Sequence, residues 1–129
     1  MSKDIQQLLE ESKYLKSIAE IDKLKTTILD ELHLPVEIKR VYKKQLKDYL
    51  FVNEIDDLKT GTFIRSIHMD DDNYILKNPC IFCDVKITDK GMLLLCKTMT
   101  KSFLHIHMDK AIIFRKLKSD EKLLLLALK

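Results

Sequence analysis

The sequence predicts an α+β fold in which N-terminal helices precede a small five-stranded antiparallel β-barrel or curled sheet, with a short helix at the C-terminus. The main observation is a change in the spacing of apolar residues near residue 55, from helical steps to alternation. The second is the length of 129 residues, which suits one domain. We therefore expect a helical region, 1–54, and a barrel-like region, 55–129, that fold as one unit.

The helical region contains an amphipathic segment that ends before Pro35. Its apolar residues share one face at helical spacing, and they are Ile18, Ile21, Leu24, Ile28 and Leu32. Ser17 and Glu20 have the spacing of a capping box, so residues 5–15 form either a separate helix or the beginning of one continuous helix. Pro35 ends the segment because proline disfavours helix at the residue before it.

A second helix is expected from Val36 to about Phe51. Its apolar side holds Ile38, Val41, Tyr42, Leu46, Tyr49 and Leu50. Five basic residues recur on the other side at steps that give them a shared solvent face, and these are Lys39, Arg40, Lys43, Lys44 and Lys47. Such a face can neutralise the backbone phosphates of a nucleic acid, and an ordinary solvated helix face is the alternative.

Alternating apolar residues bounded by turn residues predict the strands of the second region. The expected strands are Thr62–Met69, Cys80–Thr88, Met92–Thr98, Ser102–Met108 and Ala111–Leu117. Asp89-Lys90-Gly91 is the clearest hairpin turn, because Gly91 can take a positive φ. An open flat sheet exposes unpaired edges, so closure or helix cover is favoured. Ser119-Asp120-Glu121 before LLLLAL favours a C-terminal helix, with a buried strand as the alternative.

Composition excludes several classes of function. Charged residues make up 33% of the chain, and no apolar run reaches the ~18–20 residues that cross a bilayer. The 2 glycines are too few for a Gly-rich phosphate cradle, and no Ser or Cys stands in a recognisable nucleophile elbow. We therefore expect a protein that is not an enzyme, that binds no cofactor and that has no membrane partner.

The distribution of charge, cysteine and phenylalanine adds three expectations. The net charge is +3, and residues 61–129 hold 12 basic against 8 acidic side chains. The 3 cysteines, without a secretory signal, predict free thiols in a reducing compartment, which means the cytoplasm or the nucleus. Phe63, Phe82, Phe103 and Phe114 have apolar neighbours and are expected in the core, which leaves few rings for base stacking.

One set of residues has partial metal-site character. Cys80 and Cys83 have the spacing of a zinc knuckle, and Cys96, His105 and His107 can complete four ligands. Residues three apart in a strand face opposite sides, however, so the first two sulfur atoms diverge. We therefore expect free thiols and no metal site. The two histidines share a strand face, where a phosphate contact or a pH-sensitive patch is the alternative to ordinary polar residues.

Two strings in the second region carry a resemblance to known proteins. They are Leu58-Lys59-Thr60-Gly61-Thr62-Phe63-Ile64-Arg65, and Ala111-Ile112-Ile113-Phe114-Arg115-Lys116-Leu117 before Ser119-Asp120-Glu121. Residues 55–128 thereby resemble small uncharacterised proteins of giant nucleocytoplasmic DNA viruses. The resemblance implies a virion or viral-factory protein, and it transfers no site residue.

The leading functional hypothesis is a non-enzymatic protein-interaction or assembly module, such as a virion structural component. The amphipathic N-terminal helix presents apolar surface that can pack on another chain. We therefore expect a homo-oligomer whose interface holds Ile18, Ile21, Leu24 and Ile28. The alternative is a nucleic-acid-binding small-barrel domain that uses the basic face of the second helix.

Overall fold

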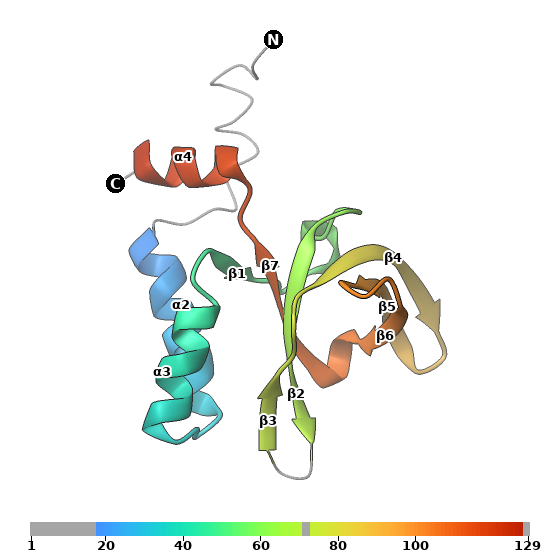
Figure 1. Ribbon diagram of the computed structural model, residues 1–129, viewed down its shortest axis with the longest axis horizontal. Coiled ribbons are helices and arrows are strands. Elements are labelled where there is room, and N and C mark those ends of the chain that lie inside the picture. The colour runs from blue at the N-terminus through green and yellow to red at the C-terminus, as the bar shows by residue number, and fades with distance from the viewer. Residues whose placement is uncertain (1–17, 71–72, 128–129) are drawn as a thin grey trace.

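The computed structural model describes residues 18–70 and 73–127 (Figure 1). Over these residues the chain forms three α-helices and one seven-stranded antiparallel sheet. The α+β class, the order of helices before strands and the short C-terminal helix are confirmed. The predicted helical segment 5–15 lies outside the described residues.

Two helices begin the described part of the chain and lie side by side (Figure 1). α2 spans Ile18–Glu31, and α3 spans Val36–Gln45. The turn between them passes through His33, whose φ is 53°. α3 starts directly after Pro35, so the expected turn is confirmed.

α3 ends at Gln45, so the helix expected up to Phe51 is too long. Leu46 is completely buried, and Asp48 adopts a positive φ of 68°, which breaks the helix. The chain then enters the strand β1, Tyr49–Phe51, which pairs with β7. The sheet therefore begins inside the region that was expected to be helical.

Six further strands follow β1. They are β2 (Phe63–Asp70), β3 (Asn73–Leu76), β4 (Cys80–Thr88), β5 (Gly91–Thr98), β6 (Phe103–His107) and β7 (Ala111–Lys116). Five of these confirm the expected strands to within one residue at each end, whereas β1 and β3 were not expected. The hairpin between β4 and β5 is also confirmed, because Gly91 has a φ of 111°.

The sheet is not a closed barrel. Its strand order is β1-β7-β2-β4-β5-β6, and β3 also pairs with β2. One edge of β2 pairs with β7, whereas β3 and β4 share its other edge. Pro79, which has no N–H to donate, lies in the gap between β3 and β4. Of the two expected architectures, a barrel and a curled sheet, the structure has the curled sheet. It contains seven strands where five were expected.

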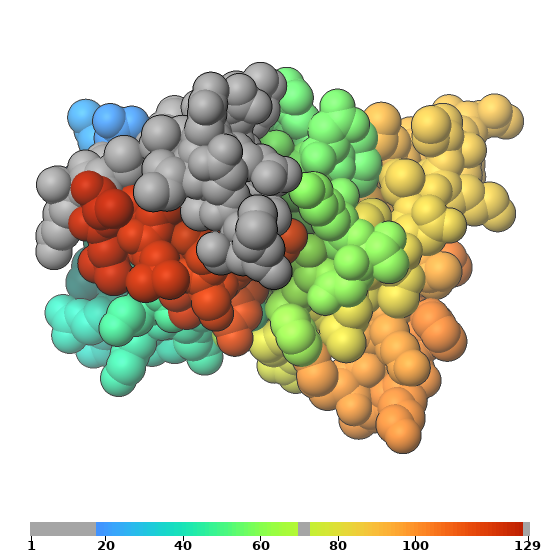
Figure 2. Space-filling model, turned by 90° about the horizontal axis from the view of Figure 1, so that it is seen from above, coloured from blue at the N-terminus to red at the C-terminus, as the bar shows by residue number. Residues whose placement is uncertain are grey.

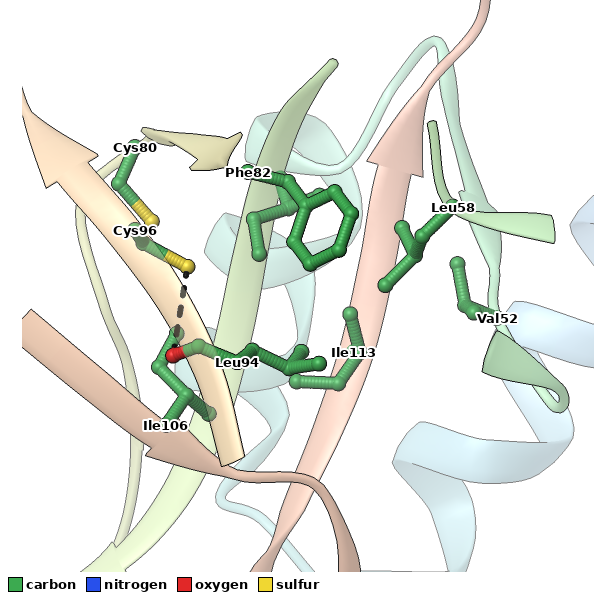
Figure 3. Packing of buried hydrophobic residues seen from close by; sticks show 9 residues of the cluster. Val52, Leu58, Cys80, Phe82, Leu94, Cys96, Ile106 and Ile113 are labelled. Carbon is green, nitrogen blue, oxygen red and sulfur yellow. Dashed lines mark hydrogen bonds between the residues drawn. The ribbon is translucent and has the colours of Figure 1, made fainter. Parts of the chain in front are cut away.

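The sheet has a core on each face. The inner core lies where the sheet curls over itself (Figure 3), and it consists of Val52, Leu58, Ile64, Cys80, Phe82, Leu94, Cys96, Ile106 and Ile113. The helix-side core lies between the other face and the helices, and it consists of Leu29, Leu46, Tyr49, Ile67 and Phe114. We call the face that carries the helix-side core the outer face. Strands β2 and β7 contribute to both cores.

A third cluster attaches the C-terminal helix. α4 spans Ser119–Ala127, and its Leu125 is 2% exposed. Leu125 packs with Ile21 of α2 and with Leu117, which follows β7. This packing places the first turn of α4 beside the end of β7, where the candidate site lies.

Candidate functional site

A basic pocket lies between two described chain segments that are distant in sequence. It has a volume of about 280 Å³, and it is lined by Lys59, Thr60, Gly61, Thr62, Phe63, Lys116, Leu117, Lys118 and Ser119. Figure 2 shows the red end of β7 and α4 beside the green segment that leads into β2. Among these described lining residues, three are lysines and none is Asp or Glu. The pocket is therefore suited to an anion.

Backbone hydrogen bonds fix the first wall of the pocket as a tight turn. Gly61 has a φ of 91°, and its N–H donates to the carbonyl of Phe82 (2.8 Å). The N–H of Phe82 donates in return to the carbonyl of Thr62 (2.8 Å). The Thr60 hydroxyl donates to the carbonyl of Cys83 (3.1 Å). Because this turn is tied to β4, the lysine at its beginning, Lys59, projects from a rigid base.

The second wall is held by an ion pair between Arg115 and Glu121. Both terminal nitrogens of Arg115 donate to the two carboxylate oxygens of Glu121, at 2.8 Å each. The backbone N–H of Lys118 donates to the same carboxylate (2.9 Å). The side chains of Lys59, Lys116 and Lys118 form no ion pair with a described acidic residue. The pocket therefore keeps three ammonium groups without a described counter-ion.

An exposed aromatic ring borders the pocket. Phe63 is 37% exposed, and the Lys116 ammonium lies 5.8 Å from the centre of its ring. Phe103 is 61% exposed, whereas Phe82 and Phe114 are buried. The expectation that all four rings are core residues is therefore wrong for Phe63 and Phe103. Both project from the outer face of the sheet.

Most of the basic face predicted for the second helix is present. Lys39 is partly covered and forms an ion pair with Asp30 of α2. The other four residues are exposed, and they are Arg40, Lys43, Lys44 and Lys47. The last of these lies beyond the end of α3, close to the pocket in the fold. The N–H of the pocket residue Leu117 donates to the carbonyl of Asp48 (2.8 Å), which is the next residue after Lys47.

The five cysteine and histidine residues considered for a metal site do not converge. Cys80 and Cys96 point into the inner core (Figure 3), whereas Cys83 lies at the irregularity in β4. His105 and His107 lie on the opposite face of the sheet, because they pair with Leu95 and Leu93. Over residues 18–70 and 73–127, no group of three or more His, Cys, Asp and Glu side chains is arranged to hold a metal ion.

The two buried thiols contact each other. A hydrogen bond from Cys96 lowers the pKa of the Cys80 thiol, against the effect of burial. The same contact with Cys80, followed by burial, raises the pKa of Cys96. All three cysteines are free, and Cys83 is the least buried of them. This pair is part of the core packing rather than of the pocket.

The four residues predicted for an oligomer interface pack largely within the chain. Ile21 is 4% exposed in the cluster with Leu117 and Leu125, and Ile18 packs against the same cluster. Ile28 packs against the helix-side core, and Leu24 is half-buried. The apolar face of α2 is therefore packed largely against other parts of the same chain.

The pocket could not be found from sequence order, because its walls are more than fifty residues apart. Lys59 and Phe63 lay within the first string of the viral resemblance, and Lys116 within the second. These positions carried no chemical motif of their own, so only the fold reveals that they meet.

No protein family, no curated protein and no solved structure matches the chain. None of the helices in the described residues is both long enough and apolar enough to cross a bilayer.

Proposed function

We propose that the protein is a non-enzymatic module that binds nucleic acid, with a backbone phosphate held in the basic pocket. The observation that carries this proposal is the convergence of Lys59, Lys116 and Lys118 on one concavity, without a lining carboxylate and beside the exposed ring of Phe63. Lysine ammonium groups neutralise phosphates and release counterions, which supplies most of the affinity of non-specific nucleic-acid binding.

The size of the pocket favours one group of a polymer over a whole small ligand. Its volume of about 280 Å³ lies just below the range for ligand pockets, roughly 300–1,000 Å³. A phosphate and its sugar fit such a volume while the rest of the strand continues along the surface. The exposed charges Arg40, Lys43, Lys44 and Lys47 then offer further phosphate contacts on the helical side.

The proposal is tested by charge reversal in the pocket. We expect the double variant Lys59→Glu, Lys118→Glu to bind a fluorescein-labelled oligo(dT) by anisotropy roughly tenfold or more weakly than wild type at low salt. The matched control is Lys23→Glu, Lys90→Glu, which changes the net charge equally at exposed sites outside the pocket. Affinity should also fall steeply with added salt. Equal losses in both double variants, or no binding by wild type, would refute a phosphate site in the pocket.

The assembly function remains a second prediction, supported by a different surface from the one first considered. α3 has no buried residue, and Val36, Ile38 and Val41 are 72%, 41% and 47% exposed. Exposed aliphatic side chains on one helix are suited to a protein partner when they form a patch. Light scattering on the purified protein separates the hypotheses, because a monomer that binds oligonucleotide contradicts self-assembly.

A further inference from the structure

One row of side chains crosses the outer face of the sheet from the basic pocket to the free edge at β6. Phe63 of β2 pairs directly with Ile81 of β4, Ile81 pairs with Lys97 of β5, and Lys97 pairs with Phe103 of β6. Directly paired residues of antiparallel strands project on the same face. These four side chains therefore form one continuous line, which we call the outer row.

Each end of the outer row combines an aromatic ring with a lysine. At the pocket end, the Lys116 ammonium lies 5.8 Å from the centre of the Phe63 ring. At the β6 end, the Lys97 ammonium lies 6.0 Å from the centre of the Phe103 ring. Flat apolar rings beside positive charges are the combination by which proteins hold single strands, because rings stack on bases and lysines attract phosphates.

The outer row lies on the part of the sheet that the helices leave open. α2 and α3 cover the outer face where β1, β7 and the end of β2 lie, through the helix-side core. Figure 1 shows β4, β5 and β6 extending away from these helices. Phe103 is accordingly the more exposed of the two rings, at 61% against 37% for Phe63. The row is thus open at the end that lies farthest from the pocket.

The dimensions of the row suit a short stretch of nucleotides. Neighbouring strands lie ~4.8 Å apart, so three strand spacings place Phe63 and Phe103 about 14 Å from each other. That span corresponds to about four nucleotides at the ~3.4 Å rise of a stacked strand, and to fewer when the strand is extended. A duplex hides the faces of its bases, so only an unpaired strand can use both rings.

We propose that single-stranded nucleic acid lies across the strands along the outer row, with one base stacked on Phe63 and another on Phe103, one phosphate beside Lys97 within the row, and another beside Lys116 on the β7 side of Phe63. This inference rests on the proposed function and extends it, because it names the single strand as the ligand and assigns the path that leaves the pocket.

A single tryptophan tests the far end of this path. The chain contains no Trp, so Phe103→Trp creates a unique fluorescent reporter on the row. We expect saturating (dT)8 to quench its emission by base stacking, and a duplex of the same length to leave it unchanged. The control Ile87→Trp, at a 77% exposed position of β4 beside the β4–β5 turn, should keep its emission when (dT)8 binds. Phe103→Ala should weaken (dT)8 binding at least about fivefold.

The outcomes distinguish the row from the pocket. If (dT)8 binds and the Lys59→Glu, Lys118→Glu variant weakens binding, but Phe103→Trp is not quenched and Phe103→Ala binds as wild type does, the row is refuted and the pocket stands. If wild type binds no oligonucleotide, both proposals fail. Quenching by duplex as strong as by (dT)8 would also refute stacking on an unpaired base. Since Phe103 is exposed, neither substitution removes core packing.

Discussion

A buried serine and a histidine form a hydrogen-bonded pair on the inner face of β2. Ser66 is 2% exposed, and its Oγ lies 2.7 Å from Nε2 of His68. Burial lowers the pKa of His68 below its ordinary value, and the nearby Lys77 ammonium acts in the same direction. The folded protein therefore favours the neutral imidazole, and protonation of His68 in mild acid opposes folding.

His68 gives the protein an acid-dependent loss of stability. The unfolded chain takes up a proton on this imidazole near pH ~6.5, whereas the folded chain does so only at lower pH. The free energy of unfolding should therefore be highest above that pH and fall as the pH drops from about 7.5 to about 5.5. We expect urea unfolding to show a smaller decrease in His68→Gln, which keeps a polar partner for Ser66. An equal decrease in both proteins would contradict this assignment.

At the scale of elements, the position of α3 against the sheet depends on a few contacts near its C-terminal half. The Tyr42 hydroxyl donates to the carbonyl of Tyr74 (2.8 Å) and accepts the N–H of Leu76 (3.3 Å), which ties the helix to β3. Leu46, directly after the helix, is completely buried in the helix-side core. No residue of α3 itself is buried, so these anchors decide its position against the sheet.

Leu46 should be the most costly residue to truncate near α3. We expect Leu46→Ala to lower the free energy of unfolding by roughly 2–5 kcal/mol, because it leaves a cavity in the helix-side core. Val41→Ala removes an aliphatic side chain that is 47% exposed, and it should change stability by less than about 0.5 kcal/mol. Chemical denaturation of both variants measures the difference. Similar losses in the two would mean that α3 is anchored elsewhere.

The sequence predicted elements better than it predicted where they end or meet. Alternation located the strands, and the glycine of the β4–β5 turn located a hairpin. The end of α3 was missed because Tyr49 and Leu50 continue the helical spacing. The helix is broken by a left-handed backbone conformation at Asp48. An Asp residue can adopt that conformation but does not require it, so the sequence does not reveal the break. The pocket and the outer row depend on strand register, which is set by tertiary packing. Apolar neighbours in sequence therefore failed to show that Phe63 and Phe103 face solvent.

At the scale of the whole molecule, the inner core and the helix-side core share two strands, β2 and β7. β2 contributes Ile64 to the inner core and Ile67 to the helix-side core, and β7 contributes Ile113 and Phe114 in the same way. Alternation along a strand sends these neighbours to opposite faces. Neither core can come apart while the central strands remain intact, so the helices and the curled sheet should unfold together.

Hydrogen exchange can measure this coupling. Ile106 lies in the inner core on β6, far from the helices, and is 2% exposed. We expect Ile106→Val to lower the free energy of unfolding by about 0.5–1.5 kcal/mol. The slowest amides of α2 should then exchange faster by the same factor as those of β5. Acceleration confined to β5 and β6 would show that the cores open separately.

The arrangement of β3 and β4 on a single edge of β2 has a consequence for how such a gene can change. Only residues 77–79 join the two strands, and side chains in a strand alternate between faces. Inserting or deleting one codon in this short link would shift the register of β4 by one residue. Cys80 and Phe82 would then face away from the inner core. Its length should therefore be among the most invariant features of any descendant or ancestor of this chain, whatever happens to its composition.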